Sequence, residues 1–310
     1  MSKLIDRNSA GVYIIAATPF TDTGALDLAS TDRMVDFYLE AGVTGMTILG
    51  IMGEAPKMAG EEAVTFARHI LNRVDGRVPV IVGVSAAGVD NMARLAHTVM
   101  EAGAGGVMVA PQPGMVTEAK LRGYMAQVCA ALPGVPICFQ DYPQTTGVQV
   151  SVDTIIGLAV DHPQIVMLKH EDWPGLTKLS QVRARSGTAN VPRLSILTGN
   201  SALFLAQEMQ RGADGAMTGF AYPEMLVQVV ARHQSGDIDG AEDLFDAYLP
   251  MVRYEQQLGL GLAIRKEVLR RRSVIASAKL RAPGPSLTPT DHDELTRLMA
   301  RLEKKLKELN

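Results

Sequence analysis

The chain has 310 residues, of which 47% are hydrophobic and 20% charged, a composition ordinary for a soluble globular protein. Its formal net charge of -3 provides no basic surface, so nucleic acid is not expected as a partner. Every apolar run ends at a glycine or a charge well short of about 18 residues, and the N-terminus lacks the apolar segment of a signal peptide, so the sequence predicts a cytoplasmic protein with no membrane partner.

Short apolar runs recur about every 30 residues, and each is followed by a longer segment with helical spacing of apolar residues, which is typical of consecutive βα units. In chain order the runs are VYIIAA from Val12, GMTIL from Gly45, VPVIVG from Val78, GVMVA from Gly106, PICFQ from Pro136, IVMLK from Ile165, LSILT from Leu194 and GAMTG from Gly215. Strands that are apolar at every position are buried on both faces, so the eight units predict a (β/α)8 barrel.

The pattern changes after the eighth run, where only helical spacing follows. We therefore predict a barrel domain over residues 1–225 and a C-terminal helical extension over 226–310. The two cysteines, Cys129 and Cys138, lie in apolar surroundings without CxxC spacing, which favours packing roles over a disulfide or a zinc site.

Active sites of such barrels lie at the C-terminal ends of the strands, so polar residues that close an apolar run are candidates. Lys169 is the most informative, because it ends the run IVMLK and is followed by a histidine and two acids. A buried lysine amine needs an anionic partner or must lose its proton, and a neutral amine can form an imine with a 2-oxo acid. By strand position alone, an ion pair with Glu171 or Asp172 explains Lys169 equally well.

Four stretches resemble the dihydrodipicolinate synthase and N-acetylneuraminate lyase family in order and spacing. They are AATPFTDTGALD, the loop GIMGEAPKM, the strand IVMLKHED and the closing segment LRAPGPSLTPTDHDEL. The resemblance implies a Schiff-base lyase that acts on pyruvate or a 2-oxo-3-deoxy sugar acid, with Lys169 as the imine-forming residue. It also implies that backbone N–H groups of the loop formed by Gly50, Ile51, Met52 and Gly53 hold the substrate carboxylate. No cofactor is required, and the family suggests a homo-oligomer, either a dimer or a tetramer.

The chain departs from the family at the proton-transfer residue. The family usually places a tyrosine at the end of strand five, whereas Gln140 takes that position here in the segment FQDYP. Glutamine is not a general acid, so we expect it to orient the reacting groups. Proton transfer is left to Asp141, to Tyr142 or to the substrate's own groups.

Other departures bear on the substrate. Ile51 and Met52 replace the hydroxyl residues common in the carboxylate loop, and the segments VAPQPGM and PQTTG lack the tyrosines and the arginine of the synthases. The QDxP segment resembles that of 2-keto-3-deoxy-pentonate dehydratases of the same family. We therefore favour a dehydratase or an atypical aldolase, with dihydrodipicolinate synthase as an alternative. The remaining residues expected to bind substrate are Glu54 as a support of the loop, Thr198, Asn200 and Thr218 as hydroxyl contacts, and Met217 and Gly219 as part of a wall beside the substrate.

Two further interpretations stay open. In the first interpretation, the missing tyrosine and loop hydroxyl groups mark a degenerate site, and the chain is a sensor that binds an oxo acid without turnover. Alternatively it is a metal-dependent aldolase on the same barrel, although three consecutive residues such as His170, Glu171 and Asp172 cannot all face one ion from regular backbone.

Overall fold

The fold is a closed barrel of eight parallel strands, each paired with its neighbours in chain order and β8 with β1. The structure, a computed structural model, describes residues 3–309. The strands are β1 (Gly11–Ile15), β2 (Gly45–Ile48), β3 (Val80–Gly83), β4 (Gly106–Val109), β5 (Ile137–Asp141), β6 (Ile165–His170), β7 (Ser195–Thr198) and β8 (Gly215–Ala216). The (β/α)8 prediction is confirmed, and every predicted apolar run overlaps a strand.

Alternate strand residues face the barrel interior and the surrounding helices. The interior is packed by Tyr13, Ile15, Ile81, Met108, Cys138, Met167, Leu197 and Met217. Neighbours such as Phe139, Leu168 and Ile196 instead join the larger cluster beneath the helices. Because side chains alternate along a strand, this pattern also fixes the direction of the polar residues at the strand ends.

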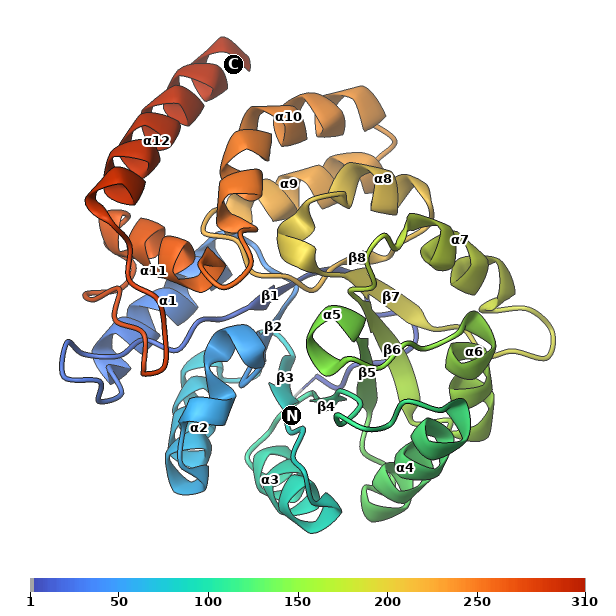
Figure 1. The fold of residues 1–310 in the computed structure, drawn as a ribbon. Helices are drawn as coiled ribbons and strands as arrows, with labels where there is room; N and C mark the ends of the chain where they lie inside the picture. The colour runs from blue at the N-terminus through green and yellow to red at the C-terminus, as the bar shows by residue number, and fades with distance from the viewer. Residues whose placement is uncertain (1–2, 310) are drawn as a thin grey trace.

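Helices enclose the barrel as a ring (Figure 1). They are α1 (Leu28–Glu40), α2 (Gly60–Val74), α3 (Val89–Glu101), α4 (Glu118–Ala131), α5 (Pro143–Thr146), α6 (Val152–Asp161), α7 (Leu176–Arg185), α8 (Leu205–Gln210), α9 (Pro223–Gln234), α10 (Ile238–Glu255), α11 (Gly261–Arg271) and α12 (Pro289–Leu309). The short 3₁₀ turns are η1 (Ile51–Gly53), η2 (Ala55–Lys57) and η3 (Asn200–Ala202). Within residues 3–309, no helix is both long and apolar enough to cross a membrane.

The last three helices lie outside the ring, and α12 projects away from it (Figure 1). The predicted boundary between residues 225 and 226 falls inside α9, which packs against β1 and β8 as the eighth helix of the barrel. The helical extension therefore begins after α9. It is connected to the barrel through α10, which packs against α9.

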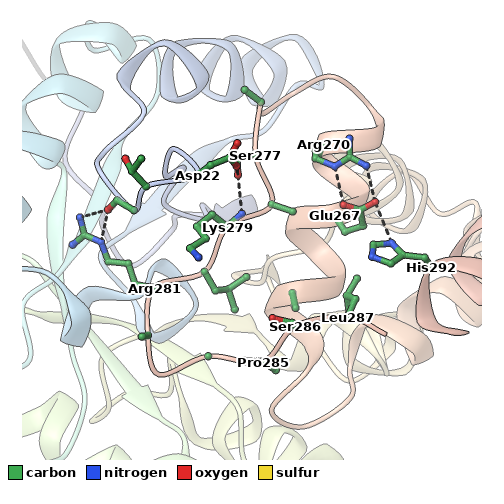
Figure 2. Close-up of a pocket in the computed structure, with 18 residues that line it drawn as sticks. Asp22, Glu267, Arg270, Ser277, Lys279, Arg281, Pro285, Ser286, Leu287 and His292 are labelled. Atoms are coloured by element: carbon green, nitrogen blue, oxygen red, sulfur yellow. Dashed lines mark hydrogen bonds and ion pairs between the residues drawn. The ribbon is translucent and has the colours of Figure 1, made fainter. Parts of the chain in front are cut away.

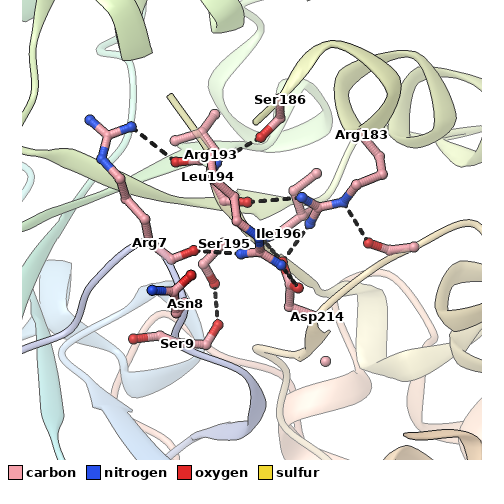
Figure 3. Close-up of polar contacts among 12 residues, drawn as sticks. Arg7, Asn8, Ser9, Arg183, Ser186, Arg193, Leu194, Ser195, Ile196 and Asp214 are labelled. Carbon is pink, nitrogen blue, oxygen red and sulfur yellow. Dashed lines mark hydrogen bonds and ion pairs between the residues drawn. The ribbon is translucent and has the colours of Figure 1, made fainter. Parts of the chain in front are cut away.

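The N-terminal end of the barrel is closed by the first residues of the chain. Ile5 is 2% exposed and packs into the interior cluster. Figure 3 shows polar contacts of the segment that follows: Arg7 donates to the carbonyl oxygen of Arg193 (2.9 Å), and Ser195 donates to that of Ser9 (2.6 Å). Asp214 accepts from Arg183 at 2.5 Å. Access to the interior is therefore from the C-terminal end of the strands.

Candidate active site

Lys169 faces the interior at the C-terminal end of β6, two residues after Met167, which packs in the interior cluster. Its side chain is buried, and Nζ lies 2.9 Å from Oε2 of Glu171. Gln140 is the strand partner of Lys169 on β5, and its Nε2 donates to the same Glu171 oxygen at 2.6 Å. The sequence left open whether Lys169 forms an ion pair or faces the cavity, and the structure shows that it does both.

These three side chains line a cavity of about 270 Å³ at the mouth of the barrel. Of the residues expected from the sequence, the cavity brings together Lys169, Gln140, Tyr142, Gly50, Ile51, Met52, Asn200, Thr218 and Gly219. It adds Ile15, Thr145, Glu171, Ser201, Arg265 and parts of the segment 255–262 between α10 and α11. Asp141, Gly53, Glu54, Thr198 and Met217 do not line it.

The loop after β2 forms a tight turn at the cavity edge. The N–H groups of Gly53 and Glu54 donate to the carbonyl oxygens of Gly50 and Ile51 at 3.0 Å each. Thr18 donates to the Gly53 carbonyl oxygen at 2.6 Å and holds the turn against β1. The first residues of a helical turn have N–H groups with no partner inside it, so those of Ile51 and Met52 remain for an anion.

Glu54, expected to support the loop, does not line the cavity. It is 1% exposed with a left-handed φ of 56°, and Oε1 accepts from Lys266 on α11 at 2.6 Å. Its other oxygen accepts from Lys57 and from the backbone N–H of Arg281, both at 3.0 Å. Glu54 therefore attaches the carboxylate loop to the C-terminal helices and does not face the substrate.

Glu54→Ala is expected to lower the free energy of unfolding by about 3–5 kcal/mol, because the fully buried Lys266 ammonium loses its anionic partner. Urea denaturation measures the change. Lys57→Ala is the control, since that lysine is partly exposed and its pair contributes about 1 kcal/mol or less. A loss below about 1 kcal/mol for Glu54→Ala would contradict the structural role of this pair.

Asp141, a candidate proton carrier, points away from the cavity. Strand alternation turns it outward with Phe139, and its Oδ2 lies 2.6 Å from Nζ of Lys178 and 3.6 Å from Nδ1 of His170. His170 also faces the helices and contacts the Gly175 carbonyl oxygen through Nε2 at 2.9 Å. Thr198 points outward by the same rule. Asp141 is thus placed to support the strands behind Lys169 and not to exchange protons with a substrate in the cavity.

Glu208 on α8 completes this polar cluster behind the barrel wall. Burial raises the pKa of Glu208 to about 7, although a hydrogen bond from Thr198 and the charge of His170 partly oppose the shift. Burial alone would lower the pKa of His170, but the Asp141 carboxylate outweighs it and raises that pKa. Burial and the charges within the cluster thus raise the pKa of both Glu208 and His170.

Glu208→Gln should make stability less dependent on pH. The folded state favours the neutral carboxyl, so wild-type stability falls as pH rises from about 4.5 through about 7 and is level above. We expect the variant to be nearly as stable as wild type at pH 5, and more stable by up to about 3 kcal/mol at pH 8.5, in urea denaturation. Glu303→Gln, an exposed glutamate, is the control. An equal difference at both pH values would contradict the expected pH dependence.

Arg265 and Glu255 are cavity residues that the strand-end rule does not find. Arg265 is 1% exposed, and its Nε donates to Oε1 of Glu255 at 2.5 Å. Burial raises the pKa of Glu255 despite that partner. A signal was present: Arg265 lies three residues after Leu262 and four before Leu269, on the apolar side of its helix, where an arginine is unusual.

A larger hollow of about 980 Å³ lies between α11, the segment 276–287 and the β1–α1 loop (Figure 2). Several of its charged side chains already have hydrogen-bond partners. Glu267 accepts from Arg270 at 2.8 Å, Asp22 accepts from Ser277 at 2.6 Å, and Arg281 donates to the Gly24 carbonyl oxygen at 2.8 Å. Lys169, the predicted imine-forming residue, lies in the smaller cavity at the barrel mouth, so that cavity is the candidate active site. Among the described residues, no three His, Cys, Asp or Glu side chains are grouped to hold a metal ion.

Comparison with known proteins agrees with this geometry. The profile of the dihydrodipicolinate synthetase family matches residues 8–305. The L-2-keto-3-deoxyarabonate dehydratase of Azospirillum brasilense is 32% identical over 297 residues, covering 94% of each chain. A crystal structure of dihydrodipicolinate synthase from Rhodopseudomonas palustris is 46% identical with a TM-score of 0.94, and the match covers 97% of this chain and 100% of that one. The structure of YagE from Escherichia coli K12, in complex with pyruvate, is 26% identical with a TM-score of 0.87, covering 95% and 98%.

Proposed function

The chain belongs to the dihydrodipicolinate synthetase family, and on that premise we propose that it is a Schiff-base lyase that dehydrates a 2-oxo-3-deoxy sugar acid. One observation carries the proposal. The amine of Lys169 and the carboxylate of Glu171 lie 2.9 Å apart in the cavity, beside Gln140 and without the tyrosine expected at the end of β5. The similarity to an L-2-keto-3-deoxyarabonate dehydratase over 94% of the chain supports the same substrate class.

The first step joins the substrate to Lys169. The substrate carboxylate rests on the N–H groups of Ile51 and Met52, which places the 2-oxo carbon near Nζ. Glu171 takes a proton from the ammonium, and the neutral amine attacks the carbonyl carbon. The carbinolamine oxygen then leaves as water with a proton returned by Glu171, and the product is a protonated imine.

The second step uses the imine as an electron sink. Glu171 removes a proton from C3, and the electron pair forms an enamine. The enamine then expels the hydroxyl group from C4, which leaves as water with the proton that Glu171 carries. Water hydrolyses the remaining imine and frees Lys169. Gln140 holds Glu171 through the 2.6 Å hydrogen bond. Tyr142, whose side chain ends in a hydroxyl group, also lines the cavity.

Two measurements test this proposal together. Borohydride added with pyruvate should cause an irreversible mass gain on Lys169, and 2-oxo-3-deoxypentonates should lose water. Turnover that persists without trapping but disappears with a chelator would favour a metal-dependent aldolase. Trapping without turnover of any 2-oxo-3-deoxy acid would favour a sensor. The dimer or tetramer expected for the family stays a prediction.

Dihydrodipicolinate synthase is the second candidate function. It is favoured by the 46% identity to the Rhodopseudomonas palustris protein of that title. The described structure provides no arginine in the segment PQTTG, which forms α5 and its C-cap, and the cavity wall there is Thr145. Consumption of pyruvate with aspartate semialdehyde, compared with dehydration of 2-oxo-3-deoxypentonates by the same preparation, distinguishes the two activities.

A further inference from the structure

Arg265 has an unused donor in the cavity. Its Nε donates to Glu255, and its Nη2 donates to the hydroxyl of Ser201 at 3.3 Å. Nη1 is buried and has no hydrogen-bond partner among the described residues. A buried N–H group without an acceptor costs free energy, so native proteins rarely keep one unless a ligand or water satisfies it.

Gly219, in the loop after β8, makes room for this guanidinium. A Cβ atom on Gly219 would lie 1.9 Å from Nη1 and 2.5 Å from Cζ of Arg265. Any larger residue would therefore displace the guanidinium from its place against the cavity wall. Both residues line the same cavity as Lys169.

An unused acceptor lies in the loop after β7. Oδ1 of Asn200 is buried without a partner, and Asn200 precedes Ser201, which Arg265 contacts. Asn200, Ser201 and Ala202 have positive φ values of 52°, 51° and 66°. Three consecutive left-handed residues without glycine are costly, and such strain is typical of functional loops.

The charges of the cavity select the kind of group that this donor and this acceptor can bind. Arg265 is paired with Glu255, and Lys169 with Glu171, so neither cation is left to neutralise a second substrate carboxylate. A carboxylate also cannot donate to Asn200. A hydroxyl group accepts one hydrogen bond and donates another, so it satisfies both.

We propose that Arg265 and Asn200 bind the hydroxyl group at C5 of the substrate, the carbon beyond the one that loses its hydroxyl. This inference rests on the proposed dehydratase and names its substrate class as 2-oxo-3-deoxy acids with a neutral hydroxylated end. The C-terminal extension thereby supplies a specificity-determining residue to the barrel.

Three five-carbon acids test the proposal, each supplied as both C4 enantiomers. They share the C4 hydroxyl and differ at C5: 4,5-dihydroxy-2-oxopentanoate, 4-hydroxy-2-oxopentanoate and 4-hydroxy-2-oxoglutarate. Because hydrogen bonds to charged groups are strong, we expect kcat/KM for the first to exceed that of the second by at least about tenfold. A ratio below about threefold, or a preference for the dicarboxylate, would overturn the proposal.

Arg265→Lys keeps a cation beside Glu255 and removes Nη1. We expect the tenfold ratio to fall to about threefold or less, while borohydride trapping of pyruvate is retained. The double variant R265M/E255Q leaves no buried charge unpaired and should give the same ratio. Arg253→Lys, an exposed position on α10, is the control. An unchanged ratio in both Arg265 variants would overturn the proposal.

The Schiff-base mechanism and the hydroxyl site are tested by separate measurements. If wild-type protein shows no trapping with pyruvate, that mechanism is overturned, and the hydroxyl site is then judged by Kd. Calorimetry with the three acids should still rank the C5-hydroxyl compound as the tightest, and Arg265→Lys should remove its advantage. A flat ranking would overturn the hydroxyl site as well.

Discussion

Lys169→Ala and Lys169→Arg are each expected to lower kcat by at least about 10³-fold and to abolish trapping of pyruvate by borohydride. Alanine has no amine. Arginine keeps a positive charge beside Glu171 but its guanidinium does not lose a proton to become a nucleophile. Dehydration of a 2-oxo-3-deoxypentonate, followed by mass spectrometry of the trapped protein, measures both effects.

The arginine variant controls for loss of folding, because the buried Glu171 carboxylate keeps a cation beside it. Lys120→Ala, on the exposed side of α4, should retain wild-type rates. Retained trapping in Lys169→Arg would mean that another amine forms the imine, and the proposed mechanism would then be wrong.

Glu171→Gln is the second large expected effect. Glutamine preserves the shape of the side chain but cannot accept a proton, so we expect kcat to fall by about 10²–10⁴-fold. Lys169 keeps its amine, so trapping of pyruvate should persist. Rapid-quench trapping with pyruvate separates this loss from that of Lys169.

Asp172→Asn is the matched control, since it changes the next residue, whose carboxylate pairs with Lys178 and does not line the cavity. It should alter kcat by no more than about threefold. If Glu171→Gln retains wild-type kcat, Tyr142 becomes the favoured proton carrier, because it is a titratable residue that lines the cavity directly after β5.

The barrel could be predicted from the sequence because its strands are apolar on both faces, a pattern that few other structures require. The boundary of the extension was less accurate, since α9 and α10 have the same helical spacing and only packing distinguishes the barrel helix. The pattern of apolar residues reports burial, and it does not report which neighbour covers a helix.

The site was predictable where one residue carried the signal. Lys169 ended a buried strand, and the structure places it in the cavity. Asp141 and Thr198 also ended strands, but each is one position out of phase with an interior residue, so its side chain faces the helices. Arg265 is distant in sequence from every strand end. Its role depends on how α11 packs over the mouth, which local sequence does not specify.

The contacts of α11 also set the order in which the protein becomes functional during synthesis. Glu54 and Gly219 are both synthesised before the α11 residues beside them, Lys266 and Arg265. A nascent chain that ends after α9 contains every strand of the barrel and Lys169, yet Glu54 lacks the Lys266 contact and Gly219 lacks the Arg265 guanidinium beside it. Translation must pass α11 before Lys266 and Arg265 can make these contacts.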